Sequence, residues 1–464
     1  MLFPTGVFAI FFLLVFAGHW ALNRWPLANR LWLLAASLAF YAWWDVQLCL
    51  LLLGVGVWAW GIGRLVEGRG GKLLWLGVAG VLAILGLFKY ADFFLEEVAG
   101  RFALAFGMEA PSLLGLVLPV GISFYCFQAI SYMIDVSRRD TAAERAPLNV
   151  VLYLGFFPHL AAGPIVRAAH FLPQLAARPD PRMVPFIMAG LLILGGLAKK
   201  LWLANTLATE LVDPAFRDPS ALSATEALLA IYGYAAQIYC DFSAYSDMAI
   251  GVAALLGYHF PRNFDQPYRA TSLRDFWQRW HISLSFWFRD YVYKPLGGNQ
   301  HGKLLTARNA FLAMVLSGIW HGAAWTFLLW GALHGAVLVI ERALGLIPRP
   351  DAPAWRRWVG ILVTFHIVCL GWVLFRAGDM ATAMGMLEAL TRWEQPTERA
   401  LGWLVAIIAV ALALHALPPR WTERLEARLA PWPAPALGLA FGVALVVILT
   451  LGPSGVAPFI YFHF

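Results

Sequence analysis

The sequence predicts an all-α polytopic membrane protein. Hydrophobic residues make up 61% of the 464-residue chain and charged residues only 13%, where a soluble domain holds about 25% charged residues. The mean hydropathy is +0.68. Apolar stretches recur along the whole chain and leave no room for a large soluble domain. We therefore expect a single membrane domain over residues 1–464, in contact with lipids and without a nucleic-acid partner.

The apolar stretches predict eleven or more spanning helices. A helix that crosses the hydrocarbon core needs about 20 mainly apolar residues. Several stretches are shorter and are expected to form re-entrant or interfacial helices, whose backbone groups must be satisfied by protein or water. The candidate stretches are 6–22, 31–43, 46–63, 73–95, 113–134, 148–166, 184–204, 225–240, 243–260, 309–325, 326–341, 359–376, 401–417 and 436–452.

The loops between the stretches predict the orientation of the chain. The first apolar run lacks a basic flank and a small-residue cleavage site, so we expect a retained helix instead of a signal peptide. Arg and Lys cluster in residues 23–30, 64–72 and 137–147. Because basic loops stay in the cytoplasm, these loops are expected there, with the N-terminus outside. The net charge of +7 is thus a topology signal.

One polar and aromatic segment, residues 261–308, interrupts the apolar rhythm. Its eight Arg or Lys residues against three Asp indicate a cytoplasmic face. Within it, residues 273–291 predict one amphipathic helix, with His281 on a polar stripe. An interfacial helix anchored by tryptophans is an alternative interpretation. The apolar stripe of the predicted helix consists of Trp277, Trp280, Leu284, Trp287 and Tyr291.

His321 is the first candidate for the chemistry. It stands in a stretch, residues 310–340, that is otherwise almost uncharged. An ionisable side chain at membrane depth is costly and usually marks a lumen, a relay or a reaction site, and imidazole exchanges a proton near neutral pH. Gly318 and Gly322 leave one helix face open, and Trp320 supplies a rigid wall. A core histidine bonded to a carbonyl is the alternative.

The other histidines show no metal-binding spacing. His334 follows His321 by thirteen residues, which places it about 220° away on an ideal helix. The two share a site only if the helix breaks, so we expect a packing role for His334. His281, His321, His334 and His366 form no HxxxH or HExxH pair. The four cysteines form no CxxC pair, and no GxSxG motif occurs. We expect no metal.

Asp241 and Asp247 form a further candidate group, six residues apart among apolar residues. Carboxylates in such a place need a charged partner or water. One interpretation is a structural ion pair, with Arg279, Arg289 and Lys294 as the nearest basic candidates. The other is that the two carboxylates line a polar lumen and contact the substrate.

Two runs, residues 279–299 and 318–322, resemble the signature segments of the membrane-bound O-acyltransferase family. The likeness is greatest to its bacterial branch that acetylates exported polysaccharides and runs nearly end to end. Cys240, Ala244 and His159 depart from the residues usual in that branch. Further matching segments are 118–125, 156–167, 241–251 and 459–464.

The resemblance implies a multi-helix bundle with funnels from both faces that meet near the histidines. It implies that His321 is a general base or a transient acyl acceptor, and that His281 orients His321 or the thioester. The donor would be acetyl-CoA or a carrier-linked acyl thioester on the cytoplasmic side, without a tightly bound cofactor. Arg279, Arg289 and Lys294 would attract its phosphates, or else would only set the topology.

The resemblance also implies a multi-pass protein of the bacterial inner membrane. It would pass an acetyl group to a periplasmic acetyltransferase that acts on an exopolysaccharide such as alginate. Two alternatives stay open at this point. One is a D-alanyl transferase of the same family that is fed by a carrier protein. The other is a transporter or flippase without covalent chemistry.

Overall fold

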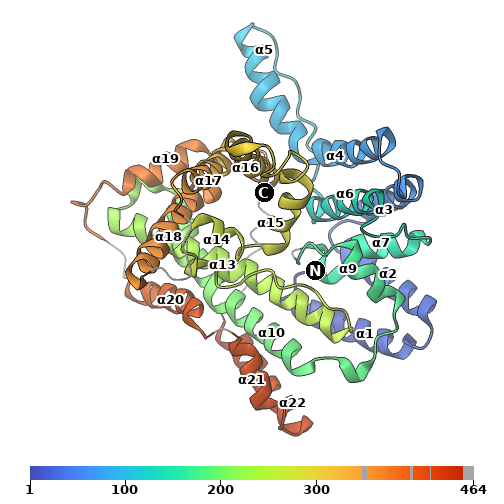
Figure 1. Ribbon diagram of the computed structural model, residues 1–464. Coiled ribbons are helices and arrows are strands. Elements are labelled where there is room, and N and C mark those ends of the chain that lie inside the picture. The colour runs from blue at the N-terminus through green and yellow to red at the C-terminus, as the bar shows by residue number, and fades with distance from the viewer. Residues whose placement is uncertain (162, 347–352, 398–400, 419, 453–464) are drawn as a thin grey trace. The chain divides into compact units, whose positions relative to one another are not determined.

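The described part of the protein is helical. The structure is a computed structural model that describes residues 1–161, 163–346, 353–397, 401–418 and 420–452. Every regular element in these ranges is a helix (Figure 1), which confirms the all-α class. The segment 459–464, which contributes to the family resemblance, lies outside the described residues.

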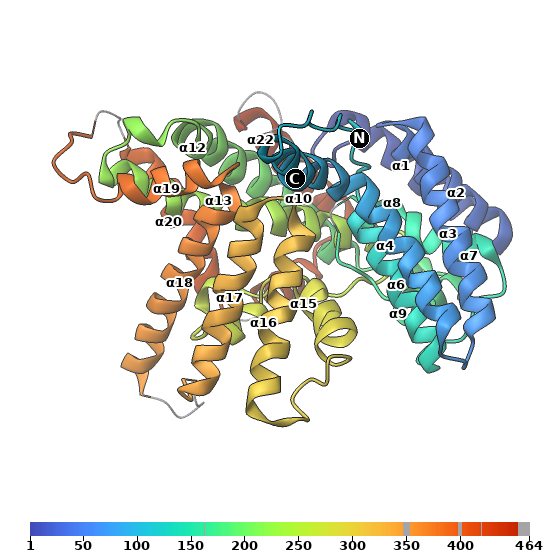
Figure 2. The ribbon, with the colours of Figure 1, turned by 90° about the horizontal axis from the view of Figure 1, so that it is seen from above.

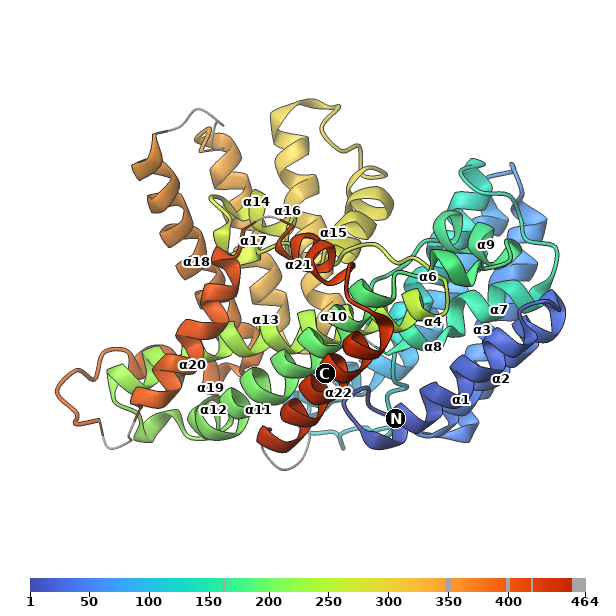
Figure 3. The same ribbon diagram turned by 90° about the horizontal axis from the view of Figure 1, so that it is seen from below.

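The chain divides into two compact units, and the single domain expected from the sequence stays a prediction. The first unit holds residues 1–186 and 252–261, and the second holds 187–251 and 262–464. In the first unit, α1, α2, α3 and α4 pack in chain order, and α6 packs on α3 and α4 (Figure 3). Its helices are α1 Gly6–Leu22, α2 Pro26–Ala42, α3 Val46–Val66, α4 Lys72–Phe93, α5 Arg101–Ala105, α6 Ile122–Arg138, α7 Pro147–Gly155, α8 Phe157–Leu160 and α9 Ala168–Ala176.

The three basic loops of the first unit lie beside one another. Arg30 Nη1 donates to Asn149 Oδ1 at 3.0 Å, and Glu67 Oε1 accepts the backbone N–H of Ala143 at 3.2 Å. A shared location is what a common cytoplasmic side requires. The second bond joins the loops 64–72 and 137–147, and the first joins 23–30 to the start of α7, directly after the loop 137–147.

In the second unit, α16, α17 and α18 stand in a row (Figure 2), and α13 is a long buried helix. A π-helical turn, Lys199–Ala204, continues α10, and another, Arg289–Tyr293, continues α15. The α-helices are α10 Phe186–Ala198, α11 Asn205–Leu207, α12 Asp213–Arg217, α13 Ala224–Leu255, α14 Leu273–Trp277, α15 Ile282–Phe288, α16 Gly302–His321, α17 Trp325–Ala343, α18 Ala354–Arg376, α19 Met380–Ala389, α20 Gly402–Ala413, α21 Trp421–Leu429 and α22 Ala434–Leu451.

Within the described ranges, six helices are long and apolar enough to cross a membrane, or seven if the bent pair 402–416 and 421–429 is one span. The prediction of eleven or more spans is therefore not confirmed. The candidate spans 225–240 and 243–260 join in one 32-residue helix, α13, which ends at Leu255, and 148–166 is broken after Gly155. The six helices are Val46–Val66, Lys72–Ala105, Phe186–Arg217, Trp325–Ala343, Ala354–Arg376 and Ala434–Leu451.

Candidate active site

His321 lies at the tip of a helical hairpin. It is the last residue of α16, and residues 322–324 connect it to α17. Glycines let the two helices approach closely, as in other membrane helix pairs. A Cβ on Gly331 would lie 2.5 Å from the carbonyl oxygen of Met314, and one on Gly318 would collide with a backbone carbonyl of α17. α16 ends at His321 and α17 begins at Trp325, and the glycine contacts hold these two helices together.

Aromatic rings from three helices surround His321, which is 3% exposed. The centroid of its ring lies 4.9 Å from that of Trp320, 5.0 Å from that of Trp330 on α17 and 4.9 Å from that of Phe375 on α18. This packing holds the imidazole in one place and excludes water from its faces. Trp320 packs directly against His321, and its contact with a substrate stays a prediction.

His281 occupies a break between two helices. The predicted continuous helix over residues 273–291 is wrong, because α14 ends at Trp277 and α15 begins at Ile282. His281 has φ 42° and ψ 57°, in the left-handed region that few residues other than glycine adopt. Such backbone strain persists only where the surroundings enforce it.

Asn263 enforces the start of α15, and the sequence reasoning missed it. Its backbone oxygen accepts the N–H of Ile282 at 2.9 Å, and its Oδ1 accepts the N–H and the hydroxyl of Ser283 at 3.2 and 2.8 Å. Its Nδ2 donates to Ser246 Oγ of α13 at 3.1 Å. The capping residue lies about twenty residues before the helix in the sequence. The residues next to the start of α15 therefore give no capping pattern from which it could be predicted.

The two candidate histidines meet at one indole. Ring centroids of His281 and Trp320 lie 6.4 Å apart, and those of Trp320 and His321 lie 4.9 Å apart. Phe242 of α13 packs edge-on against His281 at 4.5 Å. Burial lowers the pKa of His281 from 6.5 to about 3, so its imidazole is neutral at physiological pH.

Asp241 and Asp247 pair with lysines that the sequence analysis did not consider. Asp241 Oδ1 lies 2.8 Å from Lys200 Nζ, with both side chains almost fully buried, and Asp247 Oδ2 lies 2.5 Å from Lys199 Nζ. The structural ion pair is therefore present, but Arg279, Arg289 and Lys294 are not its basic partners. The available signal was Lys199-Lys200 inside the apolar stretch 184–204.

A cavity of about 800 Å³ opens in the second unit, within the size range of ligand sites, and His321 itself does not line it. Its exposed side carries four basic side chains, and its buried inner part includes Ser317, which precedes His321 by one helical turn. The basic residues are Arg274, Arg289, Lys294 and Arg342. Both Arg289 and Lys294 contact the carboxylate of Asp290, at 2.9 and 2.7 Å.

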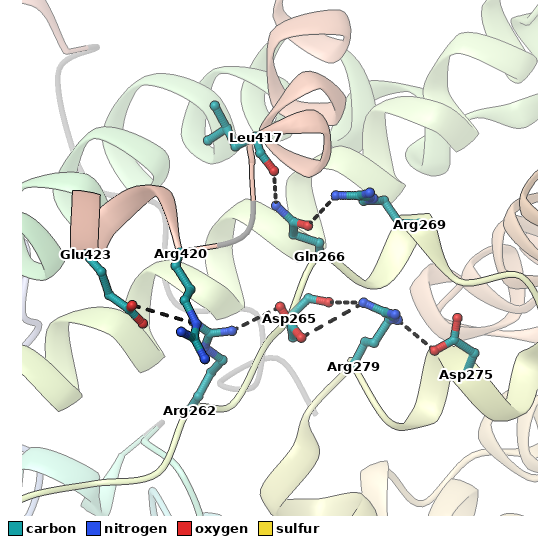
Figure 4. Close-up of polar contacts among 9 residues, drawn as sticks. All are labelled: Arg262, Asp265, Gln266, Arg269, Asp275, Arg279, Leu417, Arg420 and Glu423. Atoms are coloured by element: carbon teal, nitrogen blue, oxygen red, sulfur yellow. Dashed lines mark hydrogen bonds and ion pairs between the residues drawn. The ribbon is translucent and has the colours of Figure 1, made fainter. Parts of the chain in front are cut away.

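Arg279 lies in a different polar network (Figure 4). Its Nε contacts Asp275 at 2.7 Å, and its Nη1 donates to the backbone oxygen of Asp265 at 3.3 Å. Arg262 contacts the carboxylate of Asp265 at 3.0 Å. Arg279 does not line the cavity. The structure thus brings Arg289 and Lys294 together and separates Arg279 from them.

Among the described residues, no group of three or more His, Cys, Asp or Glu side chains could hold a metal ion. All four cysteines are buried and free.

Comparison with known proteins assigns the class. The profile of the membrane-bound O-acyltransferase family, MBOAT, matches residues 146–377, a range that includes both histidines and the whole cavity lining. The chain belongs to this family and is an O-acyltransferase.

Three relatives show which members it is similar to. The chain is 43% identical to the probable alginate O-acetylase AlgI of Pseudomonas putida, over 84% of this chain and 80% of that protein. It is 36% identical to the peptidoglycan O-acetyltransferase of Helicobacter pylori, again over 84% and 80%. It is 30% identical to the teichoic acid D-alanyltransferase of Bacillus subtilis, over 56% of this chain and 69% of that protein.

Proposed function

We propose that the protein takes an acetyl group from a cytoplasmic thioester and passes it on for O-acetylation of an exported polysaccharide such as alginate. One observation carries the proposal: a cavity with a basic rim extends to within one helical turn of the buried His321. The likeness to an alginate O-acetylase and to a peptidoglycan O-acetyltransferase supports acetyl transfer.

The basic rim suits a donor with phosphate groups. Arg and Lys bind phosphate through charge-assisted hydrogen bonds, and coenzyme A and the pantetheine arm of a carrier protein both carry phosphate. Arg289 and Lys294 share a single carboxylate, that of Asp290, so this pair of basic groups retains net positive charge. We propose that Arg289 and Lys294, together with Arg274 and Arg342, bind the phosphate groups of the donor. Arg279 is not part of this proposed donor site.

His321 acts as the general base in this proposal. Its imidazole removes the proton of an acceptor hydroxyl while that oxygen attacks the thioester carbonyl. The tetrahedral intermediate then collapses, the carbon–sulfur bond breaks, and the imidazolium returns its proton to the thiolate. The products are an oxygen ester and a free thiol. A neutral His281 against Trp320 would orient the site without competing for the proton.

We further propose that the protein lies in the bacterial inner membrane and supplies a periplasmic acetyltransferase. Apolar helices long enough to span a bilayer support a membrane location. The neighbouring basic loops of the first unit support a common cytoplasmic side for residues 23–30, 64–72 and 137–147.

The test uses the full-length protein in nanodiscs with acetyl-CoA labelled in the acetyl group, and it measures label released or passed to alginate oligosaccharide. Wild type should transfer label, and His321→Ala should lose at least about a hundredfold in rate. His366→Ala, an exposed histidine on α18, is the matched control and should keep the wild-type rate.

Two results would contradict the proposal. Full activity of His321→Ala would remove this histidine from the chemistry. Transfer from a D-alanyl carrier protein, without transfer from acetyl-CoA or an acetylated carrier, would identify the D-alanyl transferase alternative instead.

A further inference from the structure

One face of α17 leads from the cavity to His321. Arg342 and Leu338 line the cavity, and Trp330 contacts the ring of His321. His334 lies between them, four residues from Leu338 and four from Trp330. Residues four apart share a face of a helix. His334 therefore lies on α17 between the residues that line the cavity and the residue that contacts His321, the proposed general base.

Trp277 covers His334 on the cavity side. Trp277 lines the cavity, and its ring centroid lies 5.3 Å from that of His334 and 5.6 Å from that of Trp330. The rings of His334 and Trp330 lie 4.7 Å apart. We call Trp277, Trp330 and His334 the inner aromatic wall. It separates the cavity from the surroundings of His321 at this point.

The inner aromatic wall has no free space behind the ring of His334. His334 is fully buried, and a Cβ placed on Gly371 of α18 would lie 2.6 Å from its Nε2. Within the described part of the chain, neither ring nitrogen of His334 has a hydrogen-bond partner. Packing therefore fixes the ring of His334. The contribution of His334 to the site is the volume that its side chain fills.

We propose that the inner aromatic wall limits the donor to short acyl groups, with His334 as the specificity-determining residue. The inference rests on the proposed function. The thioester carbonyl has to reach His321, so the acyl tail beyond the carbonyl lies against the rings that line this path. An acetyl group adds one methyl there. A longer chain needs the space that Trp277 and His334 fill.

The experiment measures kcat/KM of the nanodisc protein with acetyl-, butyryl- and hexanoyl-CoA. His334→Ala opens space behind Trp277, so the ratio of butyryl to acetyl transfer should rise at least about tenfold, the usual effect of room for one or more methylenes. His334→Leu, similar in volume, should keep the wild-type ratio. His366→Ala serves as the histidine control. Trp277→Leu should shift the ratio in the same direction as His334→Ala.

The outcomes separate this inference from the proposed function. Wild type that transfers acetyl, with an unchanged ratio in both His334→Ala and Trp277→Leu, overturns the acyl-length role and leaves the proposed function standing. A merely structural role for His334 would lower the rates for all three donors equally and would leave the ratio unchanged. Wild type that uses none of the thioesters overturns the proposed function, and the inference with it.

Discussion

At the scale of single residues, the backbone of His281 is as informative as its imidazole. Its left-handed conformation excludes β-branched residues but accepts asparagine at little cost. His281→Asn should therefore keep the melting temperature in detergent and lose acetyl transfer. His281→Val should lose both, because it adds about 1–3 kcal/mol of strain. Thermal melts and the labelled-acetyl assay separate the two effects, and full activity of His281→Asn would show that the ring is dispensable.

The buried pair of Lys200 and Asp241 gives a stability prediction. Removal of one charge leaves the other uncompensated in a place where both side chains are almost fully buried, which costs about 3–5 kcal/mol. Lys200→Met should thus lower the melting temperature strongly, and Lys200→Met with Asp241→Leu should restore much of it. Lys199→Met is the matched control, since its partner Asp247 is one-third exposed. Equal losses in Lys200→Met and Lys199→Met would contradict this account.

The sequence predicts individual site residues better than their partners. His321 follows from an ionisable residue in an apolar stretch, His281 from the polar segment 261–308, and Trp320 from its place next to His321. The structure brings these three together, and their catalytic roles stay predictions. The partners of the aspartates and the role of Asn263 depend on contacts between distant segments. No periodicity within one segment contains that information.

At the scale of elements, the α16–α17 hairpin positions His321 through close glycine contacts. Gly331→Ala should force the helices apart, because its methyl group would meet the backbone of Met314. We expect a loss of about 1–3 kcal/mol of stability and reduced transfer. Gly195→Ala on α10 is the control, since nothing lies within 4 Å of its added methyl group. A stable and fully active Gly331→Ala variant would show that the hairpin tolerates separation.

A single carboxylate joins α17 to α14. Glu341 accepts the backbone N–H groups of Leu273 and Arg274 at 2.6 and 3.2 Å, at the start of the helix that carries Trp277. Glu341→Ala should raise amide hydrogen exchange in residues 273–277, as measured by mass spectrometry. Glu388→Ala, at an exposed ion pair with Arg392, should leave that exchange unchanged. Unchanged exchange in both variants would show that the bonds from Glu341 do not stabilise the start of α14.

Simple apolar helices are predictable from the sequence, and helices with breaks are not. The predicted stretch 6–22 coincides with α1, and 359–376 lies within α18. In contrast, the stretches 225–240 and 243–260 join in one helix, which ends at Leu255, and ion pairs with Lys199 and Lys200 satisfy its two carboxylates. The break at His281 depends on a cap supplied by Asn263.

At the scale of the whole molecule, the orientation in the membrane is open to a direct test. The native cysteines are buried, so single cysteines can be added without removing them. Gly70→Cys, in an exposed basic loop, should react with a membrane-impermeant maleimide only after lysis of spheroplasts. Trp43→Cys, exposed at the other end of the helices α2 and α3, should react in intact spheroplasts. The reverse pattern would invert the proposed topology.

The π-helical turn at residues 199–204 makes the chain length of α10 critical. A π turn closes its backbone bonds over five residues, one more than an α turn. Deletion of one residue from this turn would convert it to a regular helix and leave both flanks facing as before, because the π turn absorbs one extra residue. Deletion of one residue within Phe186–Ala198, the regular part of α10, would instead rotate the preceding part of the helix by about 100° relative to Lys199 and Lys200. The protein should therefore tolerate the loss of one residue within the turn better than the loss of one residue in the regular part of α10.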